Sequence, residues 1–306
     1  MGLLPGIGML AYKAAAPGVD GKYQTAGAYG GYLYRSIDFG VNWSQVGVSA
    51  YWNGIAISSN GQYQTAVVVN GLTYRSADYG ATWAYVNTGI GSFDSVAMSS
   101  TGQYQTAARS SGYFQVSSDF GVTWAEKGPG GSMQGIAVST TGQYQTAINN
   151  YGYAFRSTDY GQNWTQVGSS LNERYGAGMS FSGQYQYAIR ASYIDKSTDY
   201  GATWSSIYLN YPSMYGVDVS STGQYIIVPS YGSNLLLSSD YGATWQTKAT
   251  TRNWYAAAIS GSGKYQLAGN YSSGYLYNSS DFGVTWIERS FSAQTWRCVA
   301  INKSIL

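Results

Sequence analysis

The chain has 306 residues, of which only 10% are charged, and its formal net charge is +2. A chain this weakly charged lacks the basic stripe that binding to nucleic-acid phosphates requires. It also has no histidine and a single cysteine, Cys298. These absences exclude histidine general bases, disulfide frameworks and cysteine-rich zinc sites, and we expect no metal and no cofactor.

The first segment in chain order, MGLLPGIGMLAYKAAAP, is apolar. It is too short to span a bilayer, and no basic residue precedes its apolar run. We therefore expect neither a signal peptide nor membrane insertion. A chain rich in Tyr, Ser and Gly with one Cys favours an extracellular, cell-surface or virion location, although it is also compatible with the cytosol.

From residue 21 onward, two short motifs alternate along the chain. The second of them reads SIDFGVNW at 36–43 and SADYGATW at 76–83, and its aspartates are Asp38, Asp78, Asp119, Asp159, Asp199, Asp240 and Asp281. Successive aspartates are 40 or 41 residues apart, and GKYQ or GQYQ precedes each copy. A fixed period of this length indicates one supersecondary unit used seven times. The regular spacing leaves no room for a linker, so residues 1–306 are predicted to form a single domain.

Each repeat can be divided into four predicted strands. In the second repeat these are GIAIS at 54–58, QYQTAVV at 62–68, LTYRS at 72–76 and TWAYV at 82–86. Asn-Gly between the second and third strands is a hairpin signal. Abundant aromatic residues favour strands and abundant glycines favour turns, so the composition agrees with this division.

The repeated Ser-x-Asp-x-Gly-x-Thr-Trp pattern resembles the Asp-box, or BNR, repeat of sialidase-like β-propellers, and the resemblance covers essentially the whole chain. It implies an all-β, seven-bladed propeller with four antiparallel strands per blade. In that family the box is a turn between the third and fourth strands of a blade. We therefore interpret the seven aspartates as structural, with Asp bonding backbone amides, Gly adopting a positive φ and Trp packing as a plug.

The two ends of the chain predict how the ring closes. The C-terminal CVAIN at 298–302 reads like another copy of GIAIS, whereas AAAPG at 14–18 has a proline where a strand needs a hydrogen-bond donor. We expect the C-terminal strand to complete the first blade.

This topology places the variable loops on one face, which makes that face the candidate binding surface. Aligning the repeats puts one equivalent position just before each inner strand, occupied by Trp52, Phe93, Met133, Arg174, Met214, Trp254 and Trp296. A largely apolar ring at the channel mouth is one interpretation, and side chains that fill gaps between blades are the other. The candidate ligand-binding residues are Trp52, Asn53, Phe93, Arg174, Tyr175, Tyr211, Tyr215, Arg252, Trp254, Tyr255, Trp296 and Arg297.

Charged residues on the same face add a second prediction. Five arginines map to it and suit a carboxylate or sulfate: Arg109, Arg174, Arg190, Arg252 and Arg297. Asp218 stands where the second repeat has Ala56, so we expect it either to pair with a neighbouring blade or to belong to a channel site.

These observations favour a monomeric, non-catalytic binding module for a glycan or a protein. Seven-bladed Asp-box propellers also resemble photosystem assembly factors and sorting-receptor ectodomains, which makes a structural or assembly protein the alternative. A sialidase-like hydrolase is the third possibility, but its arginine triad and Tyr–Glu pair have no matching residues here, so no catalytic residue is assigned. An engineered scaffold is a further alternative, which the differences among the loops argue against.

Overall fold

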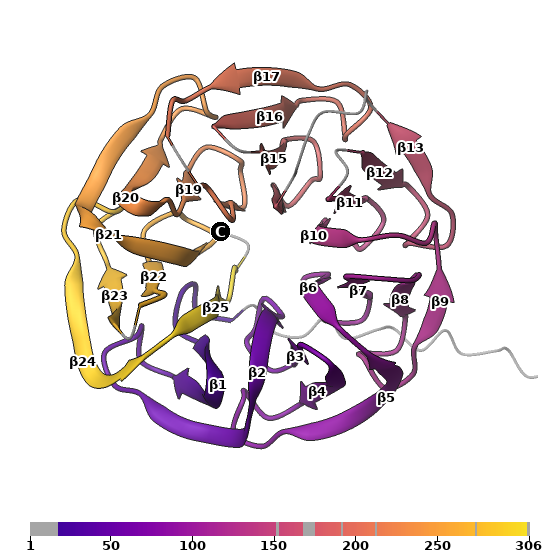
Figure 1. Cartoon of the computed structure of the whole chain (residues 1–306), viewed down its shortest axis with the longest axis horizontal. Coiled ribbons are helices and arrows are strands. Elements are labelled where there is room, and N and C mark those ends of the chain that lie inside the picture. The colour runs from indigo at the N-terminus through magenta and orange to yellow at the C-terminus, as the bar shows by residue number, and fades with distance from the viewer. Residues whose placement is uncertain are drawn as a thin grey trace, which may run out of the picture.

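A computed structural model describes residues 18–150, 153–167, 175–190, 192–211, 213–272 and 274–304. These residues form 25 strands in five sheets and contain no helix, hence none that is apolar and long enough to cross a membrane. Figure 1 shows the sheets arranged around a central opening, with β6 (Phe93–Met98) and β10 (Met133–Val138) beside it and β9 (Ala125–Lys127) and β13 (Thr165–Val167) at the rim. The all-β prediction is confirmed.

Three of the sheets contain four antiparallel strands each, in sequence order. The first runs from β6 through β7 (Gln105–Arg109) and β8 (Phe114–Ser117) to β9. The second runs from β10 through β11 (Gln145–Asn149) and β12 (Ala154–Ser157) to β13. The third contains β14 (Gly176–Met179), β15 (Gln186–Arg190), β16 (Tyr193–Ser197) and β17 (Ser205–Tyr208). Each corresponds to one repeat, as the sequence predicted.

The other two sheets are longer because one strand in each is shared between repeats. The first half of β2 (Ser44–Ile57) pairs with β1 (Gln24–Ser36), and its second half pairs with β3 (Gln64–Val68), followed by β4 (Gly71–Ser76) and β5 (Ala84–Gly91). The long strand β21 (Gln246–Ile259) pairs in the same two-part way with β20 and β22. Its sheet also contains β18 (Asp218–Val219), β19 (Ile226–Val228), β20 (Tyr231–Ser238), β22 (Gln266–Asn270), β23 (Gly274–Ser279) and β24 (Ile287–Gln294).

The two ends of the described chain meet in one sheet. Strand β25 (Trp296–Ile301) runs antiparallel to β1, with Gln24 opposite Ile301. Beyond this strand, the Asn302 side-chain amide donates to the Ser59 carbonyl at 2.8 Å, and the Ser304 backbone amide donates to Asp20 Oδ1 at 3.1 Å. The C-terminal strand therefore pairs with the first repeat. Residues 14–17, part of the segment compared with it, lie outside the described residues.

The seven Ser-x-Asp turns share one hydrogen-bond pattern. In the first, the Gly40 amide donates to Ser36 Oγ at 2.9 Å, the Asn42 amide donates to Asp38 Oδ1 at 2.9 Å, and the Trp43 indole donates to the Gly40 carbonyl at 3.0 Å. Two consecutive residues are left-handed, Phe39 with φ 63° and Gly40 with φ 78°. The sequence predicted a positive φ for the glycine alone. The aromatic residue tolerates this conformation because the turn around it is fully hydrogen-bonded.

That aromatic residue packs against the tyrosine of the GxYQ motif of the preceding repeat. Ring centroids are 4.5–5.2 Å apart in Tyr23–Tyr79, Tyr63–Phe120, Tyr104–Tyr160, Tyr144–Tyr200, Tyr185–Tyr241, Tyr225–Phe282 and Tyr265–Phe39. Buried polar contacts also join neighbouring repeats, such as Thr25 Oγ1 donating to Gln64 Oε1 at 2.6 Å. The repeated motifs therefore hold adjacent sheets together as well as shaping turns.

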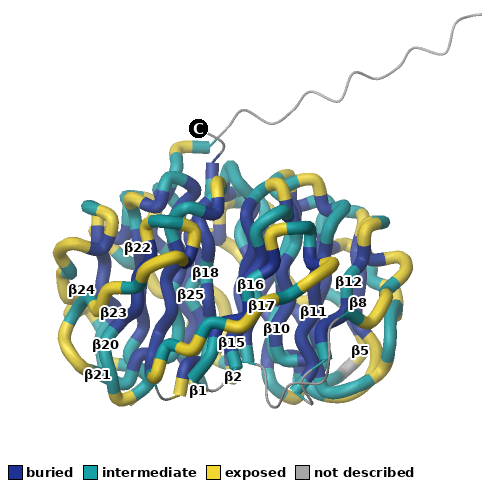
Figure 2. Tube along the Cα trace, turned by 90° about the horizontal axis from the view of Figure 1, so that it is seen from above, coloured by how far each residue is buried: buried dark blue, intermediate teal, exposed yellow. Residues whose placement is uncertain are grey.

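The core lies between adjacent sheets. Separate clusters of buried side chains surround large residues, for example Trp52 with Leu33 and Ile55, and Trp254 with Leu235 and Ile259. Figure 2 shows buried segments running through the depth of the molecule while exposed residues gather in the turns and outer strands. This leaves the inner strands free to line a central channel.

Candidate functional site

A cavity of about 330 Å³ occupies the central channel, and its walls are the inner strands. These strands approach one another closely because glycines stand where they meet. A Cβ on Gly135 would lie 2.8 Å from the Ala177 amide nitrogen, and one on Gly176 would lie 2.9 Å from the Gly216 Cα. Below the channel mouth the wall is formed mainly by glycine, alanine and aliphatic residues such as Ile57, Met98 and Val138, so the chemical character of the mouth depends on a few larger side chains.

Those larger side chains come from one position in each repeat, directly after the position that the sequence comparison aligned. We call them the mouth ring: Asn53, Asp94, Gln134, Tyr175, Tyr215, Tyr255 and Arg297. All seven line the cavity and are half-buried. Because each lies close to the point where its chain segment enters the channel wall from the variable side of the repeat, the ring lies at the variable-loop end of the channel.

An irregularity in strand pairing aims these side chains inward. Trp52 pairs with Val68 and Gly54 with Val67, so Asn53 between them has no partner across the strand. The same register shift leaves out Asp94, Gln134, Tyr255 and Arg297. A β-bulge bends its strand and redirects one side chain. Here it allows one residue to plug the gap between sheets while the next residue faces the channel.

One side of the mouth ring is a polar arc formed by Asn53, Asp94 and Gln134. The Asn53 side-chain amide donates to Asp94 Oδ1 at 3.0 Å, and the Gln134 side-chain amide donates to Asp94 Oδ2 at 3.4 Å. Burial raises the pKa of Asp94 to about 6, against the opposing effects of the Arg297 charge and the Asn53 hydrogen bond. The carboxyl group therefore titrates closer to neutrality than an exposed aspartate does.

The opposite side is a tyrosine sector, made of the mouth-ring residues Tyr175, Tyr215 and Tyr255 together with Tyr231 and Tyr271, which pack against Tyr215 and Tyr255 without lining the cavity. The Tyr215 and Tyr255 rings are stacked with centroids 5.0 Å apart, and Tyr175 meets Tyr215 edge-on at 5.5 Å. Tyr271 packs on Tyr255 at 4.9 Å. Burial raises the pKa of Tyr255. The rings of Tyr175, Tyr215 and Tyr255 therefore give this side of the cavity an aromatic surface.

Arg297 separates the tyrosine sector from the polar arc. Its guanidinium lies 4.5 Å from the Tyr29 ring centroid and 5.5 Å from that of Tyr255. The negative ring faces favour a cation at these distances. The mouth ring is thus chemically asymmetric, with amides and a carboxyl on one side, phenols on the other, and one guanidinium between them.

The structure corrects the predicted role of the preceding position. Trp52, Trp254 and Trp296 have no exposed surface, and their indole groups donate to the carbonyls of Gly31, Thr250 and Gly274. Phe93, Met133 and Met214 are also completely buried. The prediction that Trp52, Phe93, Trp254 and Trp296 contact a ligand is wrong, because these side chains fill the gaps between sheets. Arg174 lies outside the described residues.

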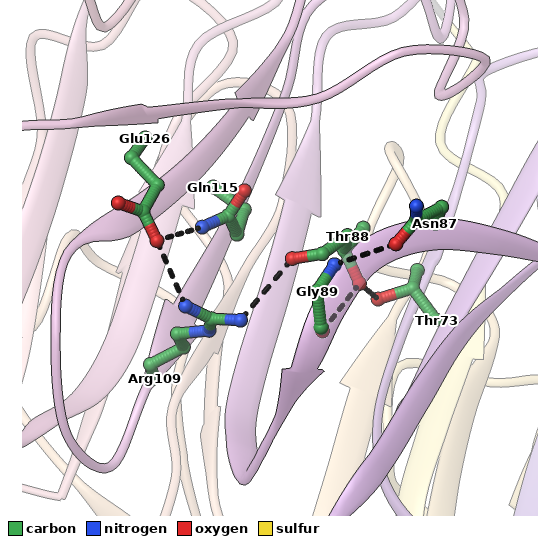
Figure 3. Close-up of polar contacts among 7 residues, drawn as sticks. All are labelled: Thr73, Asn87, Thr88, Gly89, Arg109, Gln115 and Glu126. Atoms are coloured by element: carbon green, nitrogen blue, oxygen red, sulfur yellow. Dashed lines mark hydrogen bonds and ion pairs between the residues drawn. The ribbon is translucent and has the colours of Figure 1, made fainter.

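Three of the predicted anion-binding arginines are bound within the protein. Figure 3 shows the Arg109 guanidinium between the Glu126 carboxylate and the Thr88 carbonyl, 3.1 Å from an oxygen of each. Arg190 is ion-paired with buried Asp195 at 3.1 Å. Arg252 lies over the Tyr277 ring and 3.9 Å from Glu288. Of the five arginines proposed from the sequence, only Arg297 among those described lines the cavity.

Two further predicted residues lie apart from the mouth ring. Tyr211 is half-buried against the hydrophobic cluster that contains Met214. Asp218 lines the channel further in, where it accepts hydrogen bonds from the Ile259 amide of the neighbouring strand and from the Lys303 ammonium. The expected pairing of Asp218 is thus present. Within the described ranges, no three acidic, histidine or cysteine side chains are grouped to hold a metal ion.

Sequence reasoning named five mouth-ring residues as ligand candidates and omitted Asp94 and Gln134. The sequence offers Asp94 only as one carboxyl group, with Glu173 and Asp218, of a possible hydrolase site, and it assigns no role to Gln134. Reading the position after Trp52 through all seven repeats identifies both. The missing information was the bulge, which decides that this position, rather than the one before it, faces the channel.

Comparisons with known proteins agree on the architecture. No protein-family model and no curated protein matches the chain. A functionally unknown protein from Desulfotomaculum acetoxidans superimposes with a TM-score of 0.74 at 11% identity, covering 93% of this chain and 100% of that one. YCF48 bound to D1 peptide superimposes with a TM-score of 0.62 at 14% identity, covering 82% and 86%. YCF48 from Cyanidioschyzon merolae superimposes with a TM-score of 0.62 at 14% identity, and the match covers 85% of this chain and 89% of that one.

The fold is that of a β-propeller. In a propeller the inner strands line the central channel, as β2, β6 and β10 do here. The mouth ring therefore occupies the end of the propeller channel where the variable loops meet. At these identities the likeness concerns the fold, so the chemistry of the mouth has to be taken from this chain's own residues.

Proposed function

We propose that this chain is a seven-bladed Asp-box propeller, closed by its C-terminal strand, that binds a segment of a partner polypeptide at the mouth ring without catalysing a reaction. Splitting β2 and β21 between the repeats they join gives seven groups of strands, which supports the blade count. The antiparallel pairing of β25 with β1 supports the closure.

The observation that carries the binding proposal is the mouth ring itself. Five of its residues are aimed into the channel by the same kind of bulge, and the cavity of about 330 Å³ leaves room for part of a ligand. Polypeptides present amide groups, apolar side chains and charges together. A mouth that combines amides, phenol rings, one carboxyl and one guanidinium matches this mixture. The propeller of YCF48, which binds a D1 peptide, shows that this architecture supports peptide binding in another protein.

A non-catalytic role is supported by the carboxyl groups of the channel. A glycosidase of the usual type needs two carboxyl groups facing the bond to be cleaved. Asp218 is occupied by Lys303 and by backbone amides, which leaves Asp94 as the other carboxyl group of the described cavity wall. Tyr277 and Glu288 do form a Tyr–Glu hydrogen bond, but Tyr277 is buried and neither residue lines the cavity.

A glycan is the second candidate ligand, because the Tyr215 and Tyr255 rings lie at the cavity edge where a sugar could stack. Its support is weaker than the sequence indicated. The three tryptophans among the candidate ligand-binding residues are buried, so only the tyrosine sector could supply rings on which a sugar stacks.

The test is binding of the purified chain to a random dodecapeptide array and to a glycan array, each repeated with Tyr255→Ala. Tyr85→Ala is the matched control, since Tyr85 is 68% exposed on an outer strand. We expect peptide signals that Tyr255→Ala weakens about tenfold or more, as for a tyrosine at the energetic centre of an interface, and that Tyr85→Ala leaves unchanged. Glycan signals lost in Tyr255→Ala with no peptide signal would replace the peptide proposal, and blank arrays with a folded chain would reject both ligands.

A further inference from the structure

The polar arc of the mouth ring has a fixed orientation. The Asn53 side-chain nitrogen donates both to the Phe93 carbonyl at 2.9 Å and to Asp94 Oδ1 at 3.0 Å. The Gln134 side-chain nitrogen is turned toward Asp94 as well. Both amide nitrogens are therefore committed to acceptors, and the oxygens Asn53 Oδ1 and Gln134 Oε1 point elsewhere. In the described part of the chain, neither oxygen accepts a hydrogen bond from the protein.

Asp94 lies between Asn53 and Gln134 and has no ion-pair partner among the described residues. The other carboxylate of the channel wall, Asp218, is paired with Lys303. Arg297 acts on Asp94 through its charge but lies over the rings of Tyr29 and Tyr255. A half-buried carboxylate held only by amide groups leaves part of its desolvation cost uncompensated, which a cation from a ligand can offset.

We propose that the polar arc is a subsite for a primary ammonium group of the bound polypeptide, either a lysine side chain or an N-terminal amine. This inference rests on the proposed peptide-binding function and adds the chemistry of one ligand group. An ammonium group has three hydrogen-bond donors and no acceptor. Asn53 Oδ1, a carboxylate oxygen of Asp94 and Gln134 Oε1 supply three acceptors from three consecutive repeats.

The surroundings favour the compact ammonium over a guanidinium. The three acceptors come from separate strands, whereas the planar fork of a guanidinium pairs best with both oxygens of one carboxylate. Both oxygens of Asp94 already accept amide hydrogens. The methylene stem of a lysine would lie along the apolar part of the channel wall, as lysine stems do when only their head group is polar.

The first experiment compares acetylated positional-scanning peptides containing lysine or norleucine on the parent chain, Asp94→Asn and Glu126→Gln. Asp94→Asn removes the charge with little change of shape, and Glu126→Gln removes a charge outside the cavity. We expect the parent to prefer lysine about tenfold, the size of one charge-assisted hydrogen bond, and Asp94→Asn to prefer it less than about twofold. Glu126→Gln should behave like the parent. A preference that survives in Asp94→Asn overturns the subsite. So does a parent chain that prefers neither lysine in acetylated peptides nor a free N-terminus over an acetylated one.

A second set of peptides with free N-termini separates the two sources of the ammonium. Enrichment of internal lysine in acetylated peptides assigns the subsite to a side chain, and binding only of unacetylated peptides assigns it to a chain terminus. Either result supports the inference. Enrichment of arginine over lysine at the same position would contradict the choice of ammonium.

A small-molecule arm keeps this inference separate from the proposed function. Nα-acetyl-lysine N-methylamide is titrated into the chain while the side-chain amide resonances of Asn53 and Gln134 are followed by NMR, with the norleucine analogue as control. We expect shifts only with the lysine probe, only when Asp94 is present, and weaker binding as the pH falls from 7 to 5. If peptides bind and the probe causes no such shifts, the subsite is wrong and the function stands. If the probe binds and no peptide does, the function is wrong and the subsite stands.

Discussion

The ring of Tyr265, in the last repeat, packs against that of Phe39, in the first, with their centroids 4.8 Å apart. The six other pairs of this kind join consecutive repeats, so this contact connects the two ends of the chain with the same pair of motifs. Phe39 belongs to the first Ser-x-Asp turn and Tyr265 to the last GxYQ motif, so more than 200 residues separate them along the chain. The contact therefore contributes to holding the first and last repeats together.

This contact predicts a measurable coupling. Phe39→Ala and Tyr265→Ala should each lower the free energy of unfolding, and the double variant should lose less than the sum. An aromatic pair contributes about 0.5–1.5 kcal/mol beyond the area it buries, which is the coupling we expect from a double-mutant cycle in urea. Strict additivity would show that the two rings do not stabilise each other. The Tyr104–Tyr160 pair provides a control cycle between adjacent repeats.

The buried tryptophans predict a loss of stability. Replacing Trp52 with Ala removes an indole that has no exposed surface and leaves a cavity between two sheets. Such a change costs about 3–5 kcal/mol, measured as the shift in the free energy of unfolding. Tyr85→Ala, on an exposed outer strand, should change it by no more than about 0.5 kcal/mol. A Trp52→Ala variant as stable as the parent would contradict the assigned packing role.

The turn aspartates predict sensitivity to acid. Hydrogen bonds from the Thr203 hydroxyl and amide lower the pKa of Asp199 to about 2, below its ordinary value of 3.8. The stability that its ionised form contributes is present above pH 3.8 and is lost as the pH falls toward 2. The pKa values of the other six turn aspartates are lowered too. We therefore expect the unfolding free energy to fall steeply between pH 4 and pH 2.

Thr203→Val tests the cause of that lowering. The variant removes the hydroxyl that donates to Asp199 Oδ2 but keeps the backbone amide. The pKa of Asp199, followed by NMR titration of its carboxyl carbon, should rise toward its ordinary value. The variant should also lose less stability than the parent between pH 4 and pH 2. An unchanged pKa would mean that the hydroxyl does not stabilise the carboxylate.

The raised pKa of Asp94 predicts a contribution to stability that decreases, instead of increasing, as the pH rises. Its pKa in the folded chain, about 6, lies above the ordinary value of 3.8, so the folded state holds the proton more tightly. This contribution is fully present below pH 3.8 and is lost as the pH rises through 6. Asp94→Asn should therefore be more stable than the parent at pH 7, by about 1–2 kcal/mol after allowing for partial solvent screening. Urea titrations should show that this gain in unfolding free energy disappears by pH 3.5. A gain that stays constant with pH would mean that the charge of Asp94 is not its cause.

The sequence by itself determined the repeated architecture, because its signals are local. The 40–41-residue period, the Asn70-Gly71 hairpin signal and the Ser-x-Asp turns each involve residues that are close in the chain, and their hydrogen bonds recur as expected from the residue types. The sequence also placed Tyr215, Tyr255 and Arg297 at the variable-loop end of the molecule, and all three line the cavity there. Residues near a variable loop and an inner strand share that end of the channel whatever the detailed pairing.

Only the tertiary structure decided which side chains face the channel. Side chains alternate between the two faces of a strand, so shifting the strand register by one residue moves every side chain to the opposite face. The bulge between Trp52 and Gly54 makes that exchange, turning Trp52 into the gap between sheets and Asn53 toward the cavity. Pairing with β3, a neighbour in space, creates the bulge. The contacts of Asp94 depend on the tertiary structure in the same way, because its partners Asn53 and Gln134 come from the repeats on either side of its own.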